Sequence, residues 1–374
     1  MNFLIFIGQM PPVINGQSLV TKRIYDLLKS KGADIKLIRL GTEHNSLYAR
    51  AWSYFVFFIK VAYFLSISRR KVIYFPGARS VFGFYRNLTI ILLSKICGHK
   101  TIMHIHFGDY DSFLLNKSVL FKKINQYIYQ QIDCFIVLSN SLIKNYSSIV
   151  PNGSDIRVIP NCVEIQSNGN SKFFSNSINI IYISNLIESK GYLDVLSAVN
   201  ILVNDLGLRN IKCQFFGSFV ENEMNLFKNA QEADSFLRGY ILENNLSQNV
   251  VFPGVVLGVQ KDSVLSDSDI FILPTYYSTE AQPLSVLEAM SYGKLVIATN
   301  HRALEDIIID GVNGLIVPPK SPKSIADAIV RLIGDVELTS ILSYNARSTT
   351  ISNFSPSEFN REIVKVFNDY NILK

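Results

Sequence analysis

The stretch Ile270-Phe-Ile-Leu-Pro-Thr-Tyr-Tyr-Ser-Thr-Glu280-Ala-Gln-Pro-Leu-Ser-Val-Leu-Glu288-Ala-Met-Ser-Tyr-Gly-Lys-Leu-Val-Ile-Ala298 predicts a strand, a loop, a helix and a second strand. Apolar runs at residues 270–273 and 295–298 indicate the strands. Pro283 is tolerated in a first helical turn, where its missing N–H would have no partner, so the helix is expected to start near Gln282. Strands that alternate with helices are typical of an α/β fold with a parallel sheet.

The same alternation runs along all 374 residues and predicts two doubly wound parallel sheets. The first set of strands is expected at 3–7, 35–40, 72–75, 101–106, 134–138 and 156–159. A polar, Ser/Asn-rich linker at 166–177 follows, and a second set is expected at 178–183, 212–216, 250–252, 270–273, 295–298 and 315–317. We therefore predict two Rossmann-like domains, residues 1–165 and 166–354, with ligands beyond the carboxyl ends of their strands.

The start of the helix near Gln282 is suited to binding a diphosphate. Its first backbone N–H groups, from about Ala281 to Ser285, lack acceptors within the helix and lie at the positive end of its dipole. Glu280 precedes this end, and Glu288 lies about a turn inside the helix with its side chain leaning back. Carboxylates accept hydrogen bonds from paired hydroxyls, so one acid is expected to hold sugar hydroxyls and the other a ribose. An ordinary amphipathic helix with one loop Glu and one surface Glu fits the same spacing.

The 273–293 segment resembles the Glu-x7-Glu motif of family 4 glycosyltransferases, retaining GT-B enzymes also called glycosyl transferases group 1. Two further blocks of that family follow its order: Ser184-Asn-Leu-Ile-Glu-Ser-Lys-Gly191 and Asp310-Gly-Val-Asn-Gly-Leu-Ile-Val-Pro318. The resemblance extends to the loop at 11–18, the strand end His104-Ile-His-Phe-Gly108 and the linker Ile159-Pro-Asn161, and so covers essentially the whole chain. It is similar to members that build bacterial polysaccharide, O-antigen and capsule.

The resemblance implies two Rossmann-like domains that face each other across a cleft, with the final helix, residues 355–374, packing back on the N-terminal domain. It implies transfer of a sugar from a nucleoside-diphosphate sugar to a hydroxyl, with retention and without a metal or other cofactor. The leaving diphosphate is expected to help deprotonate the incoming hydroxyl, while positive charge stabilises its departure. The catalytic residues implied are His106, Lys190 and Glu280. The donor-binding residues implied are Gly16, Gln17, Asn185, Lys190, Gly217, Ala281, Gln282, Pro283, Leu284, Ser285 and Glu288.

The acceptor-binding residues expected are Arg79, His104 and Asp109. His104 and His106 alternate along one strand and face the same side of the sheet, so only one of them need be functional. A histidine near a strand end is also common in a structural role. Asp109 fits a solvated loop position equally well.

Two departures from the family pattern leave alternatives open. Asn185 stands where the family usually has an Arg that pairs with the donor diphosphate, and an amide donates a hydrogen bond but carries no charge. Gly16-Gln17 stands where many relatives have Gly-Gly. A weakly active or partner-dependent subunit that binds nucleotide sugar at the membrane is therefore an alternative to the transferase, as is a GT-B nucleotide-sugar epimerase or hydrolase.

Charge is divided unevenly between the two predicted domains. Residues 1–165 carry a net charge of +12 and residues 166–374 a net charge of −6. The basic half indicates an anionic partner, either membrane lipid or a pyrophosphate-linked acceptor. No helix-turn-helix, zinc finger or RNP pattern accompanies this charge, which disfavours nucleic acid.

An apolar, aromatic segment at 51–67, followed by Arg69-Arg-Lys71, indicates either a buried helix or one that grazes a bilayer. Lys60 interrupts the segment, and a spanning helix needs about 20 apolar residues. Contact with an anionic membrane is therefore expected to be peripheral.

The remaining features indicate a cytoplasmic protein, at the inner face of the cytoplasmic membrane if the basic half binds lipid. Four cysteines lie in or beside apolar runs without a Cys-x-x-Cys pair, which predicts reduced, buried thiols and neither a disulfide nor a zinc site. Residues 1–8 lack a basic region and a cleavage site, and they are expected to form the first strand rather than a signal peptide.

Overall fold

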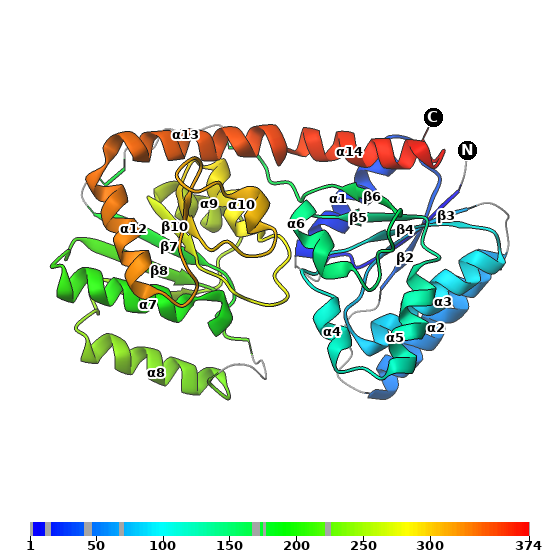
Figure 1. Ribbon diagram of the computed structural model, residues 1–374, viewed down its shortest axis with the longest axis horizontal. Helices are drawn as coiled ribbons and strands as arrows, with labels where there is room; N and C mark the ends of the chain where they lie inside the picture. Colours follow the sequence, from blue (N-terminus) through cyan, green and yellow to red (C-terminus); the bar gives the residue numbers. More distant parts are fainter. Residues whose placement is uncertain are drawn as a thin grey trace. The chain divides into compact units, whose positions relative to one another are not determined.

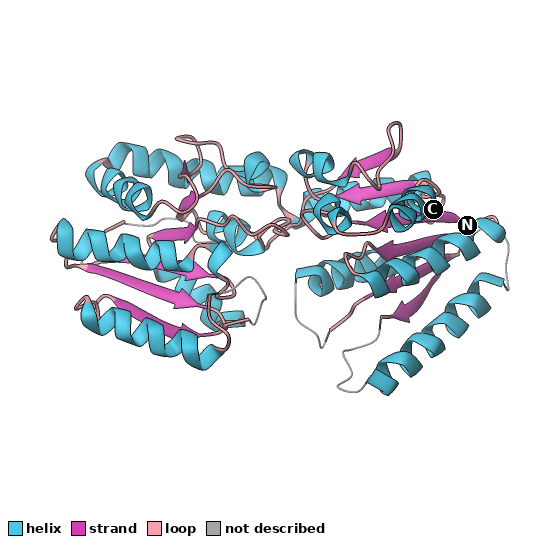
Figure 2. Cartoon of the chain, turned by 60° about the horizontal axis from the view of Figure 1, so that its bottom comes forward, coloured by secondary structure: helices cyan, strands magenta, loops and turns pink. Residues whose placement is uncertain are grey.

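The computed structural model describes residues 3–11, 16–40, 47–66, 71–166, 173–174, 177–220 and 226–373. The chain forms two compact units. The N-terminal unit comprises Met1–Asn161 with Pro356–Lys374, and the C-terminal unit comprises Cys162–Ser355. Each unit is a parallel sheet covered by helices (Figures 1 and 2), which confirms the predicted fold class of two Rossmann-like, doubly wound sheets.

The N-terminal unit has six parallel strands in the order β2-β1-β3-β4-β5-β6. Their bounds are β1 (Leu4–Gly8), β2 (Ile35–Arg39), β3 (Val72–Pro76), β4 (Lys100–His104), β5 (Cys134–Val137) and β6 (Asp155–Val158). Its helices are α1 (Gly16–Ser30), α2 (Leu47–Ser66), α3 (Val81–Ile96), α4 (Asp111–Leu115), α5 (Val119–Tyr129), α6 (Asn140–Ile143) and α14 (Pro356–Asp369), with a 3₁₀ turn at Lys144–Tyr146. The chain reverses direction across the sheet after β2, and right-handed crossovers therefore place α1 on one face and α2, α3 and α5 on the other. Helix α14 packs against α1.

The C-terminal unit has six parallel strands in the order β12-β11-β10-β7-β8-β9. Their bounds are β7 (Ile178–Ile183), β8 (Ile211–Phe216), β9 (Val250–Gly254), β10 (Ile270–Leu273), β11 (Leu295–Ala298) and β12 (Leu315–Ile316). Its helices are α7 (Tyr192–Asn200), α8 (Ala230–Glu243), α9 (Gly258–Asp267), α10 (Leu284–Ser291), α11 (Leu304–Ile307), α12 (Pro322–Gly334) and α13 (Val336–Asn353), with a 3₁₀ turn at Glu188–Lys190 and a π-helical turn at Ile201–Asp205. Helix α7 packs on α12, and α10 packs on α13.

All twelve predicted strands are present, with two informative shifts at the carboxyl ends. Strand β4 ends at His104, so His106 lies in the loop beyond it and not on the strand as predicted. The expected helix start near Gln282 is also wrong, since α10 begins at Leu284 with Pro283 as its cap residue. The physical reason is that a proline ring disfavours the helical conformation of the residue before it, which here is Gln282. The predicted linker at 166–177 lies largely outside the described residues.

Two expectations about burial need correction. All four cysteines are free thiols, but only Cys134 and Cys213 are buried, while Cys97 and Cys162 are half-buried. Within the described part of the chain, no helix is long and apolar enough to cross a membrane. Helix α2 buries only one side, which includes Phe57 and Val61, so it is not a fully buried helix. Of the basic residues after it, Arg69 and Arg70 lie outside the described residues, and the ammonium of Lys71 donates to the Phe64 carbonyl.

Candidate active site

The loops that follow β7 and β10 lock together in the C-terminal unit. Gly191 has a φ of +82°, and a Cβ added to it would lie 2.6 Å from the carbonyl oxygen of Pro274. The Ser189 carbonyl accepts a hydrogen bond from the Tyr276 N–H at 2.7 Å. Only glycine fits this left-handed position so close to another backbone. The Lys-Gly pair of the second sequence block is therefore tied to the loop that carries Glu280.

Lys190 and Glu280 form a largely buried ion pair at this junction. The Lys190 Nζ lies 3.1 Å from Oε2 of Glu280, and the two side chains are 15% and 10% exposed. The ammonium also lies over the Tyr277 ring, 5.4 Å from its centroid. The ammonium is not aligned for a hydrogen bond, since Oε2 of Glu280 is buried without a hydrogen-bond partner. The pair thus brings together a cation and a hydrogen-bond acceptor, and both can still form hydrogen bonds with a ligand.

Side chains that follow β11 hold the Glu280 loop from its other side. The Thr299 hydroxyl donates to the Thr275 carbonyl, a contact inside the core. His301 Nε2 lies 2.9 Å from the Tyr277 carbonyl, and Arg302 Nη2 donates to the Ser278 carbonyl at 2.9 Å. We did not predict His301 or Arg302 as site residues, although they directly follow a predicted strand end. Both side chains bind backbone carbonyls, and since every residue has a carbonyl, the sequence does not reveal such partners.

Helix α10 begins at Leu284, three residues beyond Ala281, which follows Glu280, and no side chain caps its N-terminus. Gln282 and Pro283 are buried, whereas Ala281, Leu284 and Ser285 are half-buried. The first turn contains no acidic residue, so its backbone N–H groups and the helix dipole present an uncompensated positive end. Such an end binds phosphate groups readily.

Glu288, further along α10, has a partner that sequence reasoning missed. Its Oε2 forms an ion pair with Lys261 Nζ, and the two side chains are partly buried. Lys261 belongs to α9, which also supplies Asp262 as acceptor for the Tyr292 hydroxyl at 3.0 Å. The ion pair engages one of the two carboxylate oxygens of Glu288. Lys261 belongs to none of the three family blocks, so only the folded structure reveals it.

Asn185 and Gly217 lie where β7 and β8 end side by side. Gly217 has a φ of +151°, and a Cβ on it would lie 1.9 Å from the Ser184 carbonyl oxygen. The Leu186 N–H donates to the Ser218 carbonyl at 2.9 Å, which holds the two loops together. Asn185 is exposed. The structure therefore brings Asn185, Gly217, Lys190 and Glu280 to one edge of one sheet.

In the N-terminal unit, the rings of His104 and His106 lie close together and are tilted by 35°. The ring centroids are 3.9 Å apart. His104 is fully buried, and its Nδ1 lies 2.7 Å from the Tyr74 hydroxyl. Burial lowers the pKa of His104 well below its usual value, helped by the neighbouring His106, and burial lowers the pKa of His106 to about 3. Both rings are therefore neutral near pH 7, which suits hydrogen bonding to hydroxyls rather than charge pairing.

Arg79 and Asp109 converge on Ser112, at the start of α4. Arg79 Nη2 donates to the Ser112 hydroxyl at 3.1 Å, and Asp109 Oδ1 accepts from the Ser112 N–H at 3.1 Å. Asp109 is buried and not a solvated loop residue. Gly16 and Gln17 form the first turn of α1, with Gly16 exposed, and the loop at 12–15 lies outside the described residues. These residues follow β1, β3 and β4, which are neighbours, and so share one sheet edge.

Four predicted site residues carry buried polar atoms that have no hydrogen-bond partner among the described residues. The atoms are Arg79 Nε, His104 Nε2, His106 Nε2 and Glu280 Oε2. Buried polar atoms are nearly always paired in folded proteins, because an unmade bond costs about 1–3 kcal/mol. Three of these atoms lie at the carboxyl edge of the N-terminal sheet and the fourth, of Glu280, at that of the C-terminal sheet. Unpaired buried atoms are what a site awaiting a ligand is expected to show.

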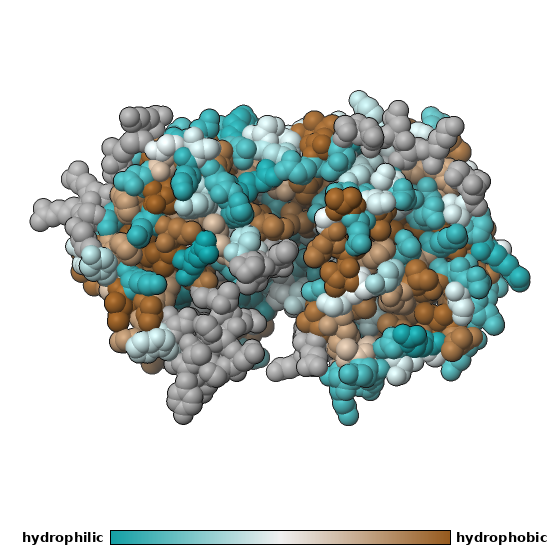
Figure 3. Space-filling model, turned by 180° about the vertical axis from the view of Figure 1, so that it is seen from behind, coloured by the Kyte–Doolittle hydropathy of each residue, from teal (hydrophilic) through white to brown (hydrophobic). Residues whose placement is uncertain are grey.

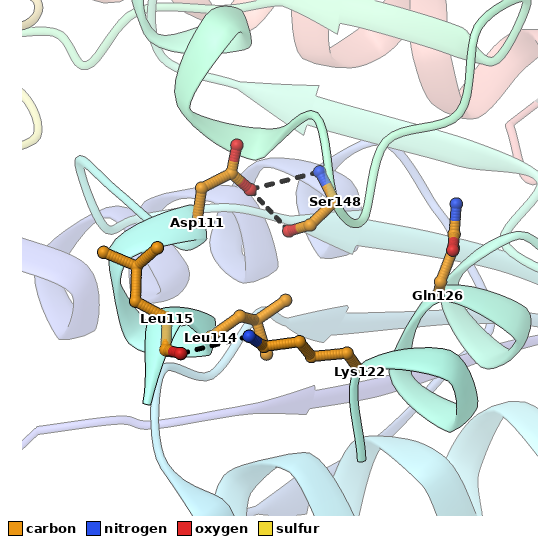
Figure 4. A pocket seen from close by; sticks show the side chains of 6 residues that line it. All are labelled: Asp111, Leu114, Leu115, Lys122, Gln126 and Ser148. Carbon is orange, nitrogen blue, oxygen red and sulfur yellow. Dashed lines mark hydrogen bonds between the residues drawn. The ribbon is translucent and has the colours of Figure 1, made fainter. Parts of the chain in front are cut away.

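Two cavities lie elsewhere. One of about 200 Å³ lies between α4 and α5 and is lined by six residues including Asp111, Lys122 and Ser148 (Figure 4). The other, of about 560 Å³, lies between α8 and β9. Neither is lined by a predicted donor residue, and the smaller one is below the roughly 300–1,000 Å³ of ordinary ligand pockets. In the described part of the chain, no three His, Cys, Asp or Glu side chains gather into a group that could hold a metal ion.

Comparisons with known proteins agree with the three sequence blocks. Residues 165–349 match the family described as "Glycosyl transferases group 1". An uncharacterized glycosyltransferase of Methanocaldococcus jannaschii is 26% identical over 282 residues, which cover 72% of this chain and 68% of that protein. A UDP-Gal:alpha-D-GlcNAc-diphosphoundecaprenol alpha-1,3-galactosyltransferase of Escherichia coli is 28% identical over 142 residues, which cover 31% of this chain but only 36% of that protein.

The similarity of fold extends over almost the whole chain. The crystal structure of HepE from Anabaena in complex with UDP has a TM-score of 0.71 at 15% identity, covering 99% of this chain and 100% of that one. At such low identity the likeness shows the fold alone. The matched C-terminal region, the order of the sequence blocks and the two parallel sheets lead to one conclusion: this chain is a glycosyltransferase of the GT-B fold, and its residues 165–349 match the glycosyl transferases group 1.

Proposed function

We propose that this chain transfers a sugar from a nucleoside-diphosphate sugar to a hydroxyl of a growing envelope glycan, with retention of anomeric configuration. The observation that carries the proposal is the Lys190–Glu280 ion pair in the loop that leads into the uncapped N-terminus of α10. It places a cation, an acceptor for hydroxyls and a set of backbone N–H groups at one edge of one sheet.

Each group has a role that its surroundings support. The N–H groups of α10 and the Lys190 ammonium would hold the diphosphate and stabilise its charge as the bond from the anomeric carbon breaks. Glu280 would accept bonds from sugar hydroxyls, and Glu288 from the ribose. The acceptor oxygen bonds to the anomeric carbon on the same face, while its proton passes to an oxygen of the departing diphosphate. Lys190 and the helix N-terminus supply positive charge themselves, so we propose that no metal cofactor is needed.

The acceptor would bind to the N-terminal unit. His106 is neutral and has a buried Nε2 without a partner, which suits orienting a hydroxyl. Arg79 and Asp109 would contact other polar groups of the acceptor. The net charge of +12 over residues 1–165 fits an acceptor linked through pyrophosphate to a lipid, and the similar Escherichia coli enzyme is named for an acceptor of that kind. We therefore place the enzyme in the cytoplasm, in peripheral contact with the inner face of the cytoplasmic membrane.

A donor screen tests this function. Purified protein is incubated with UDP-, GDP- and ADP-sugars, with and without a lipid-linked sugar acceptor, and release of nucleoside diphosphate is followed. We expect release from one donor only when the acceptor is present, and loss of that release in Lys190→Ala at saturating donor. Wild-type turnover in Lys190→Ala would contradict the role of Lys190. Glu288→Ala is expected to raise the donor KM mainly.

The same screen separates the two other functions that the sequence leaves open. Release that needs no acceptor, or conversion of the donor to its epimer, would favour a nucleotide-sugar hydrolase or epimerase. Binding of a donor without any consumption would favour a partner-dependent subunit. That outcome has a physical basis in the exposed Asn185, which brings no positive charge to the diphosphate.

A further inference from the structure

Three helices on one face of the N-terminal sheet leave their outer sides uncovered. Helix α2 packs against α3, and α3 packs against α5, so the three form a continuous layer (Figures 1 and 2). We call the solvent side of this layer the α2-α3-α5 face. Its composition is unusual in two respects, the number of apolar side chains and the absence of acidic ones.

Apolar side chains form a stripe along each helix of the face. On α2, the exposed residues Trp52, Phe55, Ile59 and Tyr63 recur at the spacing of one helix side. On α3 the exposed stripe contains Phe82, Tyr85, Leu92 and Ile96. On α5 it contains Leu120, Ile124 and Tyr127. Figure 3 shows apolar residues in brown among hydrophilic residues in teal on one side of the molecular surface. Large contiguous apolar patches mark interaction sites.

The charge around these stripes has one sign. No Asp or Glu occurs between residues 44 and 108 or between 112 and 132, and these ranges contain α2, α3 and α5 in full. Lys60, Lys95 and Lys123 are exposed beside or within the stripes, and no described carboxylate pairs with them. By contrast, α8 of the C-terminal unit mixes its exposed apolar residues with Glu232, Asp234 and Glu243.

We propose that the α2-α3-α5 face binds the surface of an anionic lipid bilayer. Aromatic and aliphatic side chains would enter the boundary between headgroups and acyl chains, and the lysines would reach the lipid phosphates. Tryptophan and tyrosine favour this boundary, because their rings have an apolar body and a polar tip. The inference deepens the proposed function and rests on it for one point, the lipid-linked nature of the acceptor.

Charge excludes the simplest other occupant, a second copy of the same face. Two such faces brought together in a symmetric dimer would oppose lysines to lysines without any carboxylate between them. An anionic bilayer instead complements both the charge and the apolar stripes.

The face ends close to the predicted acceptor residues. Asp109 and Arg79 contact Ser112 in α4, and the last residue of α4, Leu115, is exposed beside α5. The Lys122 ammonium of α5 donates to the Leu115 carbonyl at 3.0 Å, across the cavity between the two helices (Figure 4). A lipid-linked sugar whose carrier stays in the bilayer would thus reach Asp109 along α4.

Trp52 provides a direct test, because it is the only tryptophan of the sequence and it lies on the face, 66% exposed. Full-length protein is mixed with vesicles of phosphatidylcholine alone or of an equimolar mixture with phosphatidylglycerol, and tryptophan emission is recorded. We expect a blue shift and protection from an aqueous quencher with the anionic vesicles only. Co-sedimentation with unchanged Trp52 emission would overturn the proposal, since another surface would then bind the lipid.

Matched variants distinguish vesicle binding by the α2-α3-α5 face from non-specific binding by exposed apolar residues elsewhere. We expect the pair Phe82→Ser and Ile96→Ser, residues 69% and 80% exposed, to weaken vesicle binding on the order of a hundredfold. The control pair Leu242→Ser and Val259→Ser, residues 69% and 84% exposed in the C-terminal unit, is expected to bind like wild type. Equal loss in both pairs would overturn the proposal.

The charge contribution has its own variants. Each cation near an anionic membrane contributes about fivefold to binding, so Lys60→Gln with Lys95→Gln is expected to bind about 25-fold more weakly. The control is Lys212→Gln with Lys228→Gln, two exposed lysines of the C-terminal unit, for which no change is expected. Loss of binding in the control as well would contradict a specific cationic face.

Lipid binding and transfer can fail separately. Transfer to a water-soluble acceptor analogue should survive the Phe82→Ser, Ile96→Ser pair, because neither residue belongs to the predicted donor or acceptor set. If the protein binds vesicles through Trp52 but transfers no sugar, lipid binding by the α2-α3-α5 face is supported and the proposed transferase function is refuted. A blue shift that depends on protein concentration without vesicles would instead indicate self-association and overturn the lipid proposal.

Discussion

Replacing Glu280 by Gln is expected to have opposite effects on two ligands of one site. Without a ligand, Lys190 Nζ lies 3.1 Å from Oε2 of Glu280, so the cation proposed to bind the diphosphate is already paired with a carboxylate. A nucleoside diphosphate must compete for that cation and also lie near the negative charge of Glu280. The neutral amide of Glu280→Gln removes both obstacles. We therefore predict that UDP without its sugar binds more tightly to the variant.

The size of the effect follows from the geometry of the ion pair. Two charges about 4 Å apart attract by about 4 kcal/mol at an effective dielectric constant of about 20. The ion pair is 15% and 10% exposed, so solvent and side-chain entropy offset only part of this energy. A net gain of about 1 kcal/mol gives about fivefold tighter UDP binding. Transfer should fall on the order of a hundredfold, because the sugar hydroxyls lose a charged acceptor.

The measurements are titration calorimetry with UDP and steady-state transfer with the donor identified in the screen. Glu288→Gln is the matched control, since it makes the same charge change on α10 but breaks a different ion pair, with Lys261. We expect it to weaken UDP binding about fivefold through loss of the ribose contact. UDP that binds Glu280→Gln no better than wild type would refute the competition between donor and carboxylate.

Three further predictions concern stability and the neighbouring ion pair. Gly217→Ala should destabilise the protein by about 3 kcal/mol or more in thermal unfolding, because the new Cβ would lie 1.9 Å from a backbone oxygen. The control, Gly239→Ala on α8, places its Cβ in open space and should be neutral or stabilising. The pKa of His106 in the folded protein is lowered to about 3, so the unfolded chain binds more protons than the folded one between pH 6.5 and 3. The free energy of unfolding should therefore fall by about 1.4 kcal/mol for each pH unit as the pH is lowered through that window. His106→Gln should remove this contribution to the pH dependence. Lys261→Met should raise the donor KM several-fold with little change in kcat, because it leaves Glu288 without the cation that positions it; an unchanged KM would count against that role.

The sequence predicted the strands better than the contacts between loops. Apolar runs flanked by polar residues located all twelve strands, since burial between two helix layers demands such runs. The helix start was misplaced by two residues because Pro283 restricts Gln282 as well as itself. Motif spacing brought Lys190 and Glu280 into one site, because family blocks follow neighbouring strands β7 and β10.

Partners that come from outside the blocks could not be predicted in this way. Lys261 reaches Glu288 from a helix 27 positions earlier, and the Tyr74 hydroxyl reaches His104 across two neighbouring strands. Such pairs depend on helix rotation and strand register, which local pattern does not determine. The α2-α3-α5 face was visible in part, as the apolar segment at 51–67, but its continuation onto α3 and α5 required the packing of three helices.

The charged groups of the candidate residues in each unit share one property that bears on their proposed roles. Lys190 is held by Glu280, Lys261 holds Glu288, and Arg79 and Asp109 share Ser112 as a partner. Each group is thereby positioned before any ligand arrives, so less side-chain entropy is lost on binding. A ligand must displace or share these partners, however, which lowers its net affinity. Substrates that engage several of the groups at once gain most, because only they replace both members of a pair. With the proposed roles, a whole nucleoside-diphosphate sugar would reach Lys190, Glu280 and Glu288 together, whereas UDP would meet the cation of one pair and leave its carboxylate unmatched. The site should therefore favour intact donor over the product it releases, and the Glu280→Gln variant should reverse that preference.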